Sequence, residues 1–333
     1  MYFYIGDVKK MEQKIMLFSL SSNLELAKEI ASAMNMELSS CEMKRFADGE
    51  VNVQINETVR GADCYVIQST CPPVNDNLME LLIMCDALKR ASAKSISVVI
   101  PYYGYSRSDK KSKSRMPITS KLIADMIEKS GASRVVYMDI HSTQTQGFFN
   151  CPVDNLLSLP TFCNYLLKKK LENVVIVSPD HNGTTRAREY GKLLNAPIAI
   201  IDKRFSEMTK TDEMHIIGDV KGKTCIIVDD MCETALTMSY AALALKENGS
   251  GDIYACCTHG LLTNDAPKLI ENSPLKELII TNTVPVPQEK RGSKITVLSV
   301  GEIFGHALNR IINNEPLSGI FTYNFDESKK ELL

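Results

Sequence analysis

Apolar residues in this chain gather into short continuous runs, and between the runs they recur every three or four positions. The runs are rich in Val and Ile and do not alternate with polar residues, which is typical of strands covered on both faces of a parallel sheet. We expect strands at Ile15–Leu20, Cys64–Ser69, Ile96–Tyr102, Arg134–Ile140, Val174–Ser178, Pro197–Asp202, Thr224–Asp229, Ile253–Thr258, Glu277–Thr281 and Ile295–Val300.

The stretches between these runs have the periodicity of amphipathic helices. The expected helices are Asn23–Met34, Asn77–Ala91, Pro117–Lys129, Thr184–Leu194, Thr234–Asn248 and Glu302–Asn313. Alternation of strand and helix indicates βαβ units with right-handed crossovers. We therefore predict an α/β fold.

A faint internal repeat indicates two similar units. The segment that runs from Phe18 through a helix to Asn35 has an echo from Val177 through a helix to Asn195. At about 150 residues per domain, the length of 333 residues also fits two domains. We predict a first domain over residues 1–155, a second over residues 156–321 and a charged tail over residues 322–333.

The composition narrows the choice of partners. Lys and Arg total 38 against 40 Asp and Glu, a net charge of −2, which argues against nucleic acid as a partner. No apolar run reaches the roughly 18 residues that a membrane span needs, so we expect no membrane association either. The cysteines form no CxxC pair and several lie in expected strands, so we predict reduced thiols and a cytoplasmic location.

The clearest candidate site follows one of the expected strands. Asp229 and Asp230 end the run that begins at Cys225, and ligands of parallel sheets bind at this end of the strands. Two carboxylates can accept hydrogen bonds from the vicinal hydroxyls of a ribose, and a helix N-terminus can bind its phosphate. The loop that opens the next helix consists of Glu233, Thr234, Ala235, Leu236 and Thr237. The alternative is an Asp-Asp helix cap without a ligand, but the apolar run before the pair and the threonines after it favour a site.

This arrangement resembles the phosphate-binding loop shared by type I phosphoribosyltransferases and the ribose-phosphate diphosphokinases, also called phosphoribosyl pyrophosphate synthetases. Other segments are similar to the diphosphokinases and follow in the order of that family from about residue 14 to about residue 321. These segments are Phe46–Glu50, Asn75–Leu82, Pro101–Arg107, Met138–Phe149, Val153–Leu156, Ser178–Asp180 and Cys257–Gly260.

The resemblance implies two domains of the type I phosphoribosyltransferase kind, each with a central, mostly parallel sheet flanked by helices. It implies transfer of the β,γ-diphosphoryl group of ATP to the 1-hydroxyl of ribose 5-phosphate, with Mg²⁺ as the cofactor and AMP as the second product. It also implies a homo-oligomer built from dimers, commonly a hexamer, with inorganic phosphate and ADP as allosteric effectors.

On the ATP side, the resemblance assigns a loop around Gly49 to the adenine. Asp48 and Glu50 would accept hydrogen bonds from its amino group, while Phe46 and Arg107 would stack on its two faces. Ordinary core packing is the alternative for a lone phenylalanine, and the two neighbouring carboxylates favour the binding role.

A cationic stretch follows Arg107. Its residues assigned to ATP binding are Ser108 and Asp109, and those assigned to a flexible loop are Lys110, Lys111, Lys113 and Arg115. Such a run is usually a solvated loop or a nucleic-acid patch. Because it interrupts a strand-to-helix connection in a nearly neutral protein, we predict a mobile flap over the triphosphate, hinged at Gly104.

The resemblance also places a metal site and a catalytic group. His141 would contact the metal–ATP complex, Asp180 would be the other Mg²⁺ position, and Lys203 would stabilise charge during transfer. A structural histidine and a solvated lysine are the alternatives. Of the two metal positions, Asp180 is the better candidate because Mg²⁺ prefers oxygen donors.

Four departures from the family pattern fall on the ribose-phosphate side. Phe205 stands where an arginine is expected, Glu233 replaces aspartate, and Leu236 replaces glycine. After Asp180, where the family has a pair of glycines or alanine and glycines, this chain has His181, Asn182 and Gly183. If position 236 takes positive φ, its Cβ costs roughly 1–2 kcal/mol. Two hypotheses therefore remain: an active diphosphokinase with an adapted sugar-phosphate pocket, and a catalytically weakened paralogue that binds nucleotide and regulates or scaffolds an active subunit.

Overall fold

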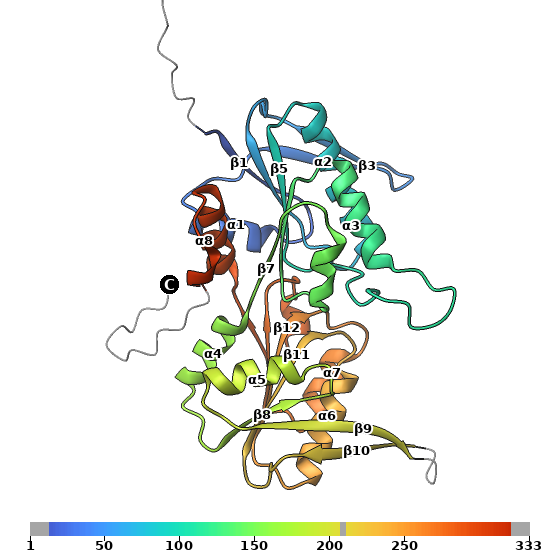
Figure 1. Ribbon diagram of the computed structural model, residues 1–333, viewed down its shortest axis with the longest axis vertical. Coiled ribbons are helices and arrows are strands. Elements are labelled where there is room, and N and C mark those ends of the chain that lie inside the picture. The colour runs from blue at the N-terminus through green and yellow to red at the C-terminus, as the bar shows by residue number, and fades with distance from the viewer. Residues whose placement is uncertain (1–12, 207–210, 321–333) are drawn as a thin grey trace, which may run out of the picture.

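The computed structural model describes residues 13–206 and 211–320, with the backbone alone over residues 203–206 and 211–213. Two α/β lobes lie one above the other along the long axis of the molecule (Figure 1). Each lobe has its own sheet, and a short hairpin forms a third.

The first lobe has a five-stranded, fully parallel sheet in the order β1-β4-β5-β6-β7. Its strands are β1 (Ile15–Ser19), β4 (Asp63–Ile67), β5 (Ser95–Ile100), β6 (Arg134–Met138) and β7 (Val153–Leu156). Its helices are α1 (Leu24–Ala33), α2 (Val74–Arg90), α3 (Thr119–Ser130) and a 3₁₀ turn, Thr143–Phe148.

The second lobe has a seven-stranded sheet in the order β10-β9-β8-β11-β12-β13-β14, parallel except for the edge strand β10. Its strands are β8 (Val174–Ser178), β9 (Ile198–Ser206), β10 (Thr211–Ile217), β11 (Thr224–Cys232), β12 (Ile253–Gly260), β13 (Glu277–Thr281) and β14 (Ile295–Leu298). Its helices are α4 (Leu159–Lys168), α5 (Thr184–Leu193), α6 (Leu236–Glu247), α7 (Ala266–Asn272) and α8 (Gly301–Ile312), with 3₁₀ turns at Gln288–Lys290 and Leu317–Ile320.

Successive residues of each strand supply opposite faces of the sheet. In β6, Val135 and Tyr137 pack under α2 and α3, whereas Val136 and Met138 pack under α1 and α8. The second sheet is divided in the same way, with α6 and α7 on one face and α4 and α5 on the other. Both faces are therefore apolar, which explains the continuous Val and Ile runs and confirms the predicted parallel sheets flanked by helices.

Helix α8 follows the last strand of the second sheet but lies against α1 of the first lobe (Figure 1). The close approach requires glycine, because a Cβ on Gly305 would come within 2.5 Å of the Ala33 Cβ and one on Gly301 within 2.5 Å of the Glu29 Cβ. The predicted domain boundary between residues 155 and 156 falls within β7, and those domain limits remain a prediction.

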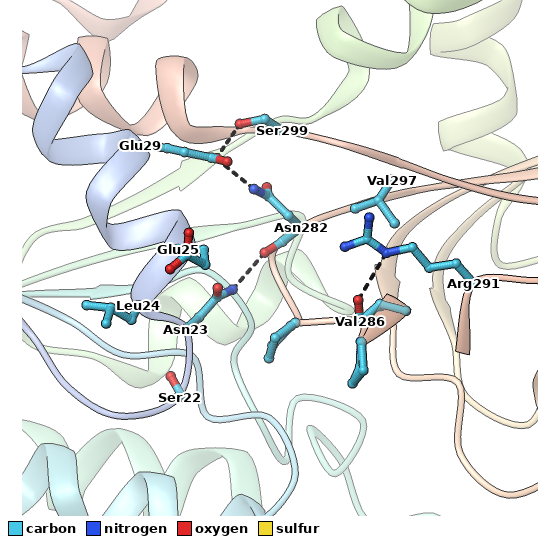
Figure 2. Close-up of a pocket in the computed structure, with 12 residues that line it drawn as sticks. Ser22, Asn23, Leu24, Glu25, Glu29, Asn282, Val286, Arg291, Val297 and Ser299 are labelled. Atoms are coloured by element: carbon cyan, nitrogen blue, oxygen red, sulfur yellow. Dashed lines mark hydrogen bonds between the residues drawn. The ribbon is translucent and has the colours of Figure 1, made fainter. Parts of the chain in front are cut away.

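A groove of about 430 Å³ separates the start of α1 from the segment between β13 and β14 (Figure 2). Polar contacts bridge the two lobes along it: Asn282 donates to Glu29 over 2.7 Å, and Asn23 donates to the backbone oxygen of Asn282 over 2.8 Å. Ser299 also donates to Glu29, over 2.5 Å. The groove is lined by none of the site residues predicted from the sequence.

The remaining strands form an antiparallel hairpin, β2 (Cys41–Arg45) and β3 (Val51–Ile55), which the sequence pattern did not predict. Cys41 and Met43 pack against the first core while Glu42 between them is exposed, so polar and apolar residues alternate and no continuous apolar run marks the strand. Strands β7 and β10 and helices α4 and α7 were also missed. The predicted charged tail lies outside the described residues.

Candidate active site

The two lobes meet at the carboxyl ends of their parallel strands, as the fold predicts. His141 follows β6 of the first lobe, and Asp230 lies near the end of β11 in the second. The His141 Nδ1 atom is 2.7 Å from the Asp230 Oδ2 atom. This contact joins two residues that the sequence analysis assigned to different parts of the reaction.

The neighbouring acids of β11 differ in charge preference. Burial, followed by the negative charge of Asp230, raises the pKa of Asp229 to about 8. Burial opposes ionisation of Asp230 too, but the hydrogen bond from His141 and the charge of Arg186 lower its pKa. The same hydrogen bond raises the pKa of His141. Adjacent carboxylates here divide into one that favours its neutral form and one that stays ionised.

Arg186 is a site residue that the sequence analysis missed. Its Nη1 atom lies 3.5 Å from Asp229 and 3.4 Å from Asp230, so one guanidinium faces both acids. It comes from α5, whose mostly polar sequence gives no signal for one arginine among several charged residues. Its partners lie more than forty residues further along the chain, so only the fold brings the three together.

The residue with positive φ in the phosphate loop is Ala235, one position before the leucine that the sequence analysis considered. Ala235, rather than Leu236, has a left-handed conformation, with φ 62°, and α6 begins at Leu236 instead of Thr234. Leu236 has ordinary backbone angles and a side chain that is 43% exposed. The condition for backbone strain at position 236 is therefore not met, because the turn takes its positive φ at the small residue Ala235.

Arg107 and Glu233 form an ion pair between the lobes. The hydrogen bond that Arg107 donates to Glu233 raises the pKa of Arg107, which keeps the guanidinium charged. The sequence analysis placed Arg107 beside adenine and Glu233 beside the sugar phosphate, so this pair brings the two predicted substrate sides together. Asp109 lies near enough for its charge to contribute to the raised pKa of His141.

The cationic stretch after Arg107 is partly buried at Ser108 and Asp109 and exposed over residues 110–117. Its charged members Lys110, Lys111, Lys113 and Arg115 all face solvent, while the backbone of Ser108 bonds to Tyr105 and Ser120. Gly104 is a site of close approach, because a Cβ there would come within 2.5 Å of the Thr70 carbonyl oxygen. A hinge role for Gly104 therefore has no support, and closure of the stretch over a ligand stays a prediction.

The predicted adenine-reading residues form the tip of the β2–β3 hairpin. Gly49 takes φ 97° and donates to the Phe46 carbonyl, and Asp48 accepts from the backbone of Glu50. Phe46 is 55% exposed, which rules out core packing as its role. Arg45, the last residue of β2 before this turn, bonds to Glu80 and Asp76 of α2 and so fixes the tip end of the hairpin.

The remaining predicted residues cluster near the ends of β8 and β9. Asp180 is exposed and accepts from the backbone of Gly183, which holds the loop before α5. His181 bonds to Asp202 over 2.7 Å. The backbone of Lys203 pairs with Met214 in the β9–β10 ladder, whereas the side chains of Lys203 and Phe205 lie outside the described part of the structure.

Comparison with known proteins matches both ends of the chain to a single family. Residues 15–131 match the N-terminal domain of ribose phosphate pyrophosphokinase, and residues 205–322 match the phosphoribosyl synthetase-associated domain. A ribose-phosphate pyrophosphokinase from Oceanobacillus iheyensis is 51% identical over 310 residues, 93% of this chain and 98% of its own. One from Clostridium perfringens is 53% identical over 312 residues, with the same coverage. This chain belongs to the ribose-phosphate pyrophosphokinase family.

The solved structures agree with that assignment. The crystal structure of phosphoribosylpyrophosphate synthetase from Mycobacterium smegmatis is 38% identical, covers 91% of this chain and all of its own, and gives a TM-score of 0.86. The predicted fold, two lobes of the type I phosphoribosyltransferase kind, is confirmed. No described helix of this pyrophosphokinase family member has the length and apolarity to cross a membrane.

Proposed function

We propose that this chain transfers the diphosphoryl group of ATP to ribose 5-phosphate, giving 5-phosphoribosyl 1-diphosphate and AMP for nucleotide biosynthesis. The observation that carries the proposal is the meeting of His141 and Asp230 across the lobes, beside a phosphate-type loop that opens α6. Identities of 50–53% to ribose-phosphate pyrophosphokinases over nearly their full lengths favour a catalyst over a regulatory paralogue.

The ribose 5-phosphate binds at the carboxyl end of β11. Asp229 and Asp230 accept hydrogen bonds from the ribose hydroxyls, and the loop from Glu233 to Thr237 holds the 5-phosphate against the start of α6. The left-handed Ala235 turns the backbone so that successive N–H groups can face one anion. Leu236 contributes its N–H and leaves its apolar side chain exposed, which is how the loop accommodates leucine.

The ATP binds toward the first lobe. Arg107 lies beside the ribose-phosphate loop through its pair with Glu233, so its charge is already held near the reacting phosphates. Asp48 and Glu50 read the adenine amino group from the exposed hairpin tip, with Phe46 on the ring face. Lys110, Lys111, Lys113 and Arg115 close over the triphosphate, with Ser108 and Asp109 at the base of that stretch.

The donor set fits Mg²⁺ shared with ATP. Mg²⁺ usually keeps several waters and binds through one or two carboxylates plus substrate phosphates. The described residues contain no cluster of three or more metal-ligating side chains, and Asp180 offers an exposed carboxylate. Asp180 would therefore hold the ion with the nucleotide. Bound there, Mg²⁺ neutralises charge on the phosphate oxygens.

The protein supplies positioning and charge for the transfer step. The 1-hydroxyl attacks the β-phosphorus of ATP, the bond from that phosphorus to the α,β-bridging oxygen breaks, and AMP leaves. Lys203 stabilises the charge that develops on the transferred group, and His141 stays oriented by its bond to Asp230. The hydroxyl proton is released as the new ester bond forms.

The decisive experiment measures AMP from ATP and ribose 5-phosphate with Mg²⁺, at several phosphate concentrations. Activity well above a Lys203→Ala control is the expected result. No AMP above that control from the purified protein overturns the proposal, and co-purification with an active homologue would then identify a regulatory subunit.

The family resemblance extends the proposal to assembly and regulation. We expect a homo-oligomer built from dimers, activation by phosphate and inhibition by ADP, in the cytoplasm. Light scattering of the purified protein gives the oligomeric state, and the AMP assay with added phosphate or ADP gives the regulation.

A further inference from the structure

A β-bulge in β12 lies directly behind the candidate site. Between Cys257 and His259 the strand advances two residues while β13 advances one, from Ile280 to Thr281. Thr258 is therefore the extra residue. Adjacent strand residues normally point to opposite faces, and a bulge re-aims one of them.

Because of the bulge, both Thr258 and His259 reach the end of β6 in the first lobe. The Thr258 Oγ1 atom donates to the Asp139 carboxylate over 2.7 Å. The His259 Nε2 atom lies 3.2 Å from the Met138 carbonyl oxygen, which can only accept, so Nε2 carries the proton. Two adjacent residues thus bind two adjacent residues of the other lobe.

The polar side chains of this joint form one connected hydrogen-bond network. With Nε2 protonated, the His259 Nδ1 atom accepts from the Thr283 hydroxyl over 2.9 Å, and Thr281 donates to the Thr258 carbonyl. Asp139 also accepts from the backbone and hydroxyl of Ser158. His259 is 2% exposed and packs edge-on against Tyr102, with ring centroids 5.0 Å apart. A connected network that includes the buried side chains of Thr258, His259 and Ser158 favours one geometry.

The joint is connected to the reacting groups at both of its ends. On the second lobe, β12 pairs with β11 on either side of the bulge, where Asp229 lies opposite Cys257. On the first lobe, Asp139 has a left-handed φ of 40° and stands two residues before His141. The two lobes are therefore joined at two neighbouring points: the bulge binds Met138 and Asp139, and Asp230 of the adjacent strand lies 2.7 Å from His141.

We propose that Thr258 and His259 are positioning residues, which fix His141 of the first lobe against the acid pair of the second. The proposal rests on the proposed function. Neither residue touches a substrate; each acts through the backbone or side chain that precedes His141. Loosening the joint displaces His141 from Asp230, so it lowers turnover more than substrate binding.

Two matched pairs of variants test this role. Thr258→Val keeps the shape and removes the hydroxyl, whereas Thr258→Ser keeps the hydroxyl; His259→Leu removes both nitrogens, whereas His259→Gln keeps a donor for Met138. A misplacement of about 1 Å can cost roughly 100-fold in rate. We expect kcat for AMP formation to fall on the order of 10- to 100-fold in Thr258→Val and His259→Leu, with both KM values within about threefold. Thr258→Ser and His259→Gln should retain kcat within about threefold.

Cys256→Ala is the control for general damage to the strand. Cys256 is fully buried in β12 but packs in the cluster under α4 and α5, so its truncation should lower Tm and leave kcat unchanged. An unchanged kcat in a folded Thr258→Val protein overturns the positioning role. Equal losses in Thr258→Val and Thr258→Ser also overturn it. If the wild-type protein makes no AMP, the proposed function fails first, which separates the two results.

Discussion

The two predicted halves of the site are built in opposite ways. Asp229 and Asp230 lie at the end of a central strand, where Arg186 and His141 already face them. Phe46, Asp48 and Glu50 lie at the exposed tip of the β2–β3 hairpin. The hydrogen bond of Asp48 goes to the backbone of Glu50, within the same turn. The first arrangement is held together by contacts among its own charged groups, and the second is exposed to solvent.

The difference teaches how each half should respond to mutation. Removing a charge from a buried, paired group leaves its partners unsatisfied, so stability changes together with activity. Removing a side chain from an exposed tip costs only the contact with the ligand. We therefore expect the β11 half to couple stability with catalysis, and the hairpin half to keep them separate.

The largest effect should come from Asp230→Asn. The amide cannot balance the charges of His141 and Arg186, so we expect kcat to fall by about 100-fold and the free energy of unfolding by about 1–3 kcal/mol at pH 7. Because the folded pKa of Asp230 is lowered, this loss of stability should shrink as pH falls through and below the ordinary aspartate range. Thermal unfolding at pH 2.5 and 7, with the AMP assay at pH 7, measures both. An unchanged Tm at pH 7 would contradict the expected coupling.

Asp229→Asn should change stability in the opposite direction from Asp230→Asn. The folded pKa of about 8 lies above the ordinary value of 3.8, so between these values the folded protein holds a proton that the unfolded chain releases. Stability from this group therefore falls as pH rises through that window, and the amide removes the fall. We expect the variant to have a higher Tm than the wild type at pH 8, and a smaller Tm difference at pH 5. Each kcal/mol of stabilisation corresponds to about 2–4 °C in Tm. Equal Tm differences at the two pH values would refute this account, and activity should fall at both.

Phe46→Ala tests the exposed half. Stacking of a base on an aromatic ring is worth about 1–3 kcal/mol, so the KM for ATP should rise by about 10-fold while Tm stays unchanged. Leu122→Ala is the matched control, since Leu122 is also 55% exposed but lies on α3. Its KM should match that of the wild type. A fall in Tm for Phe46→Ala would show that the tip has a structural role.

The smallest effect should come from Phe205→Arg. It restores the cation that the family pattern places two residues after Lys203. We expect a fall of a few-fold in the KM for ribose 5-phosphate, or a similar rise in kcat, in line with one added charge-assisted hydrogen bond. Unchanged kinetics would show that Arg204 or another cation serves there already.

The sequence revealed most of the sheet strands because their residues are buried on both faces. It missed β2, in which Cys41 and Met43 face the core and Glu42 between them faces solvent. It also missed α4 and α7, where Pro160 and Pro267 stand in the first turns. Proline is compatible with that position but weakens a pattern read from periodicity.

The sequence predicted those residues of the candidate site that belong to a continuous motif. The acid pair could be found because it follows an apolar run directly. Arg186 could not, because its partners come from another element. The same holds for the joint at Thr258, because an extra residue in one strand becomes visible only when its neighbour is aligned beside it. What sequence reasoning lacks here is the register between segments distant in the chain.

The return of α8 to the first lobe bears on how the polypeptide matures as it leaves the ribosome. Val300, Phe304 and Leu308 complete one face of a sheet whose strands were all synthesised by residue 156. Until α8 has been synthesised, Leu17 and Val136 lack part of the helix packing that buries them. A folding intermediate formed before then exposes apolar surface to chaperones or to other nascent copies. Helix α8, the last α-helix among the described residues, thus completes the core of the first lobe only after nearly all of the second lobe has been synthesised.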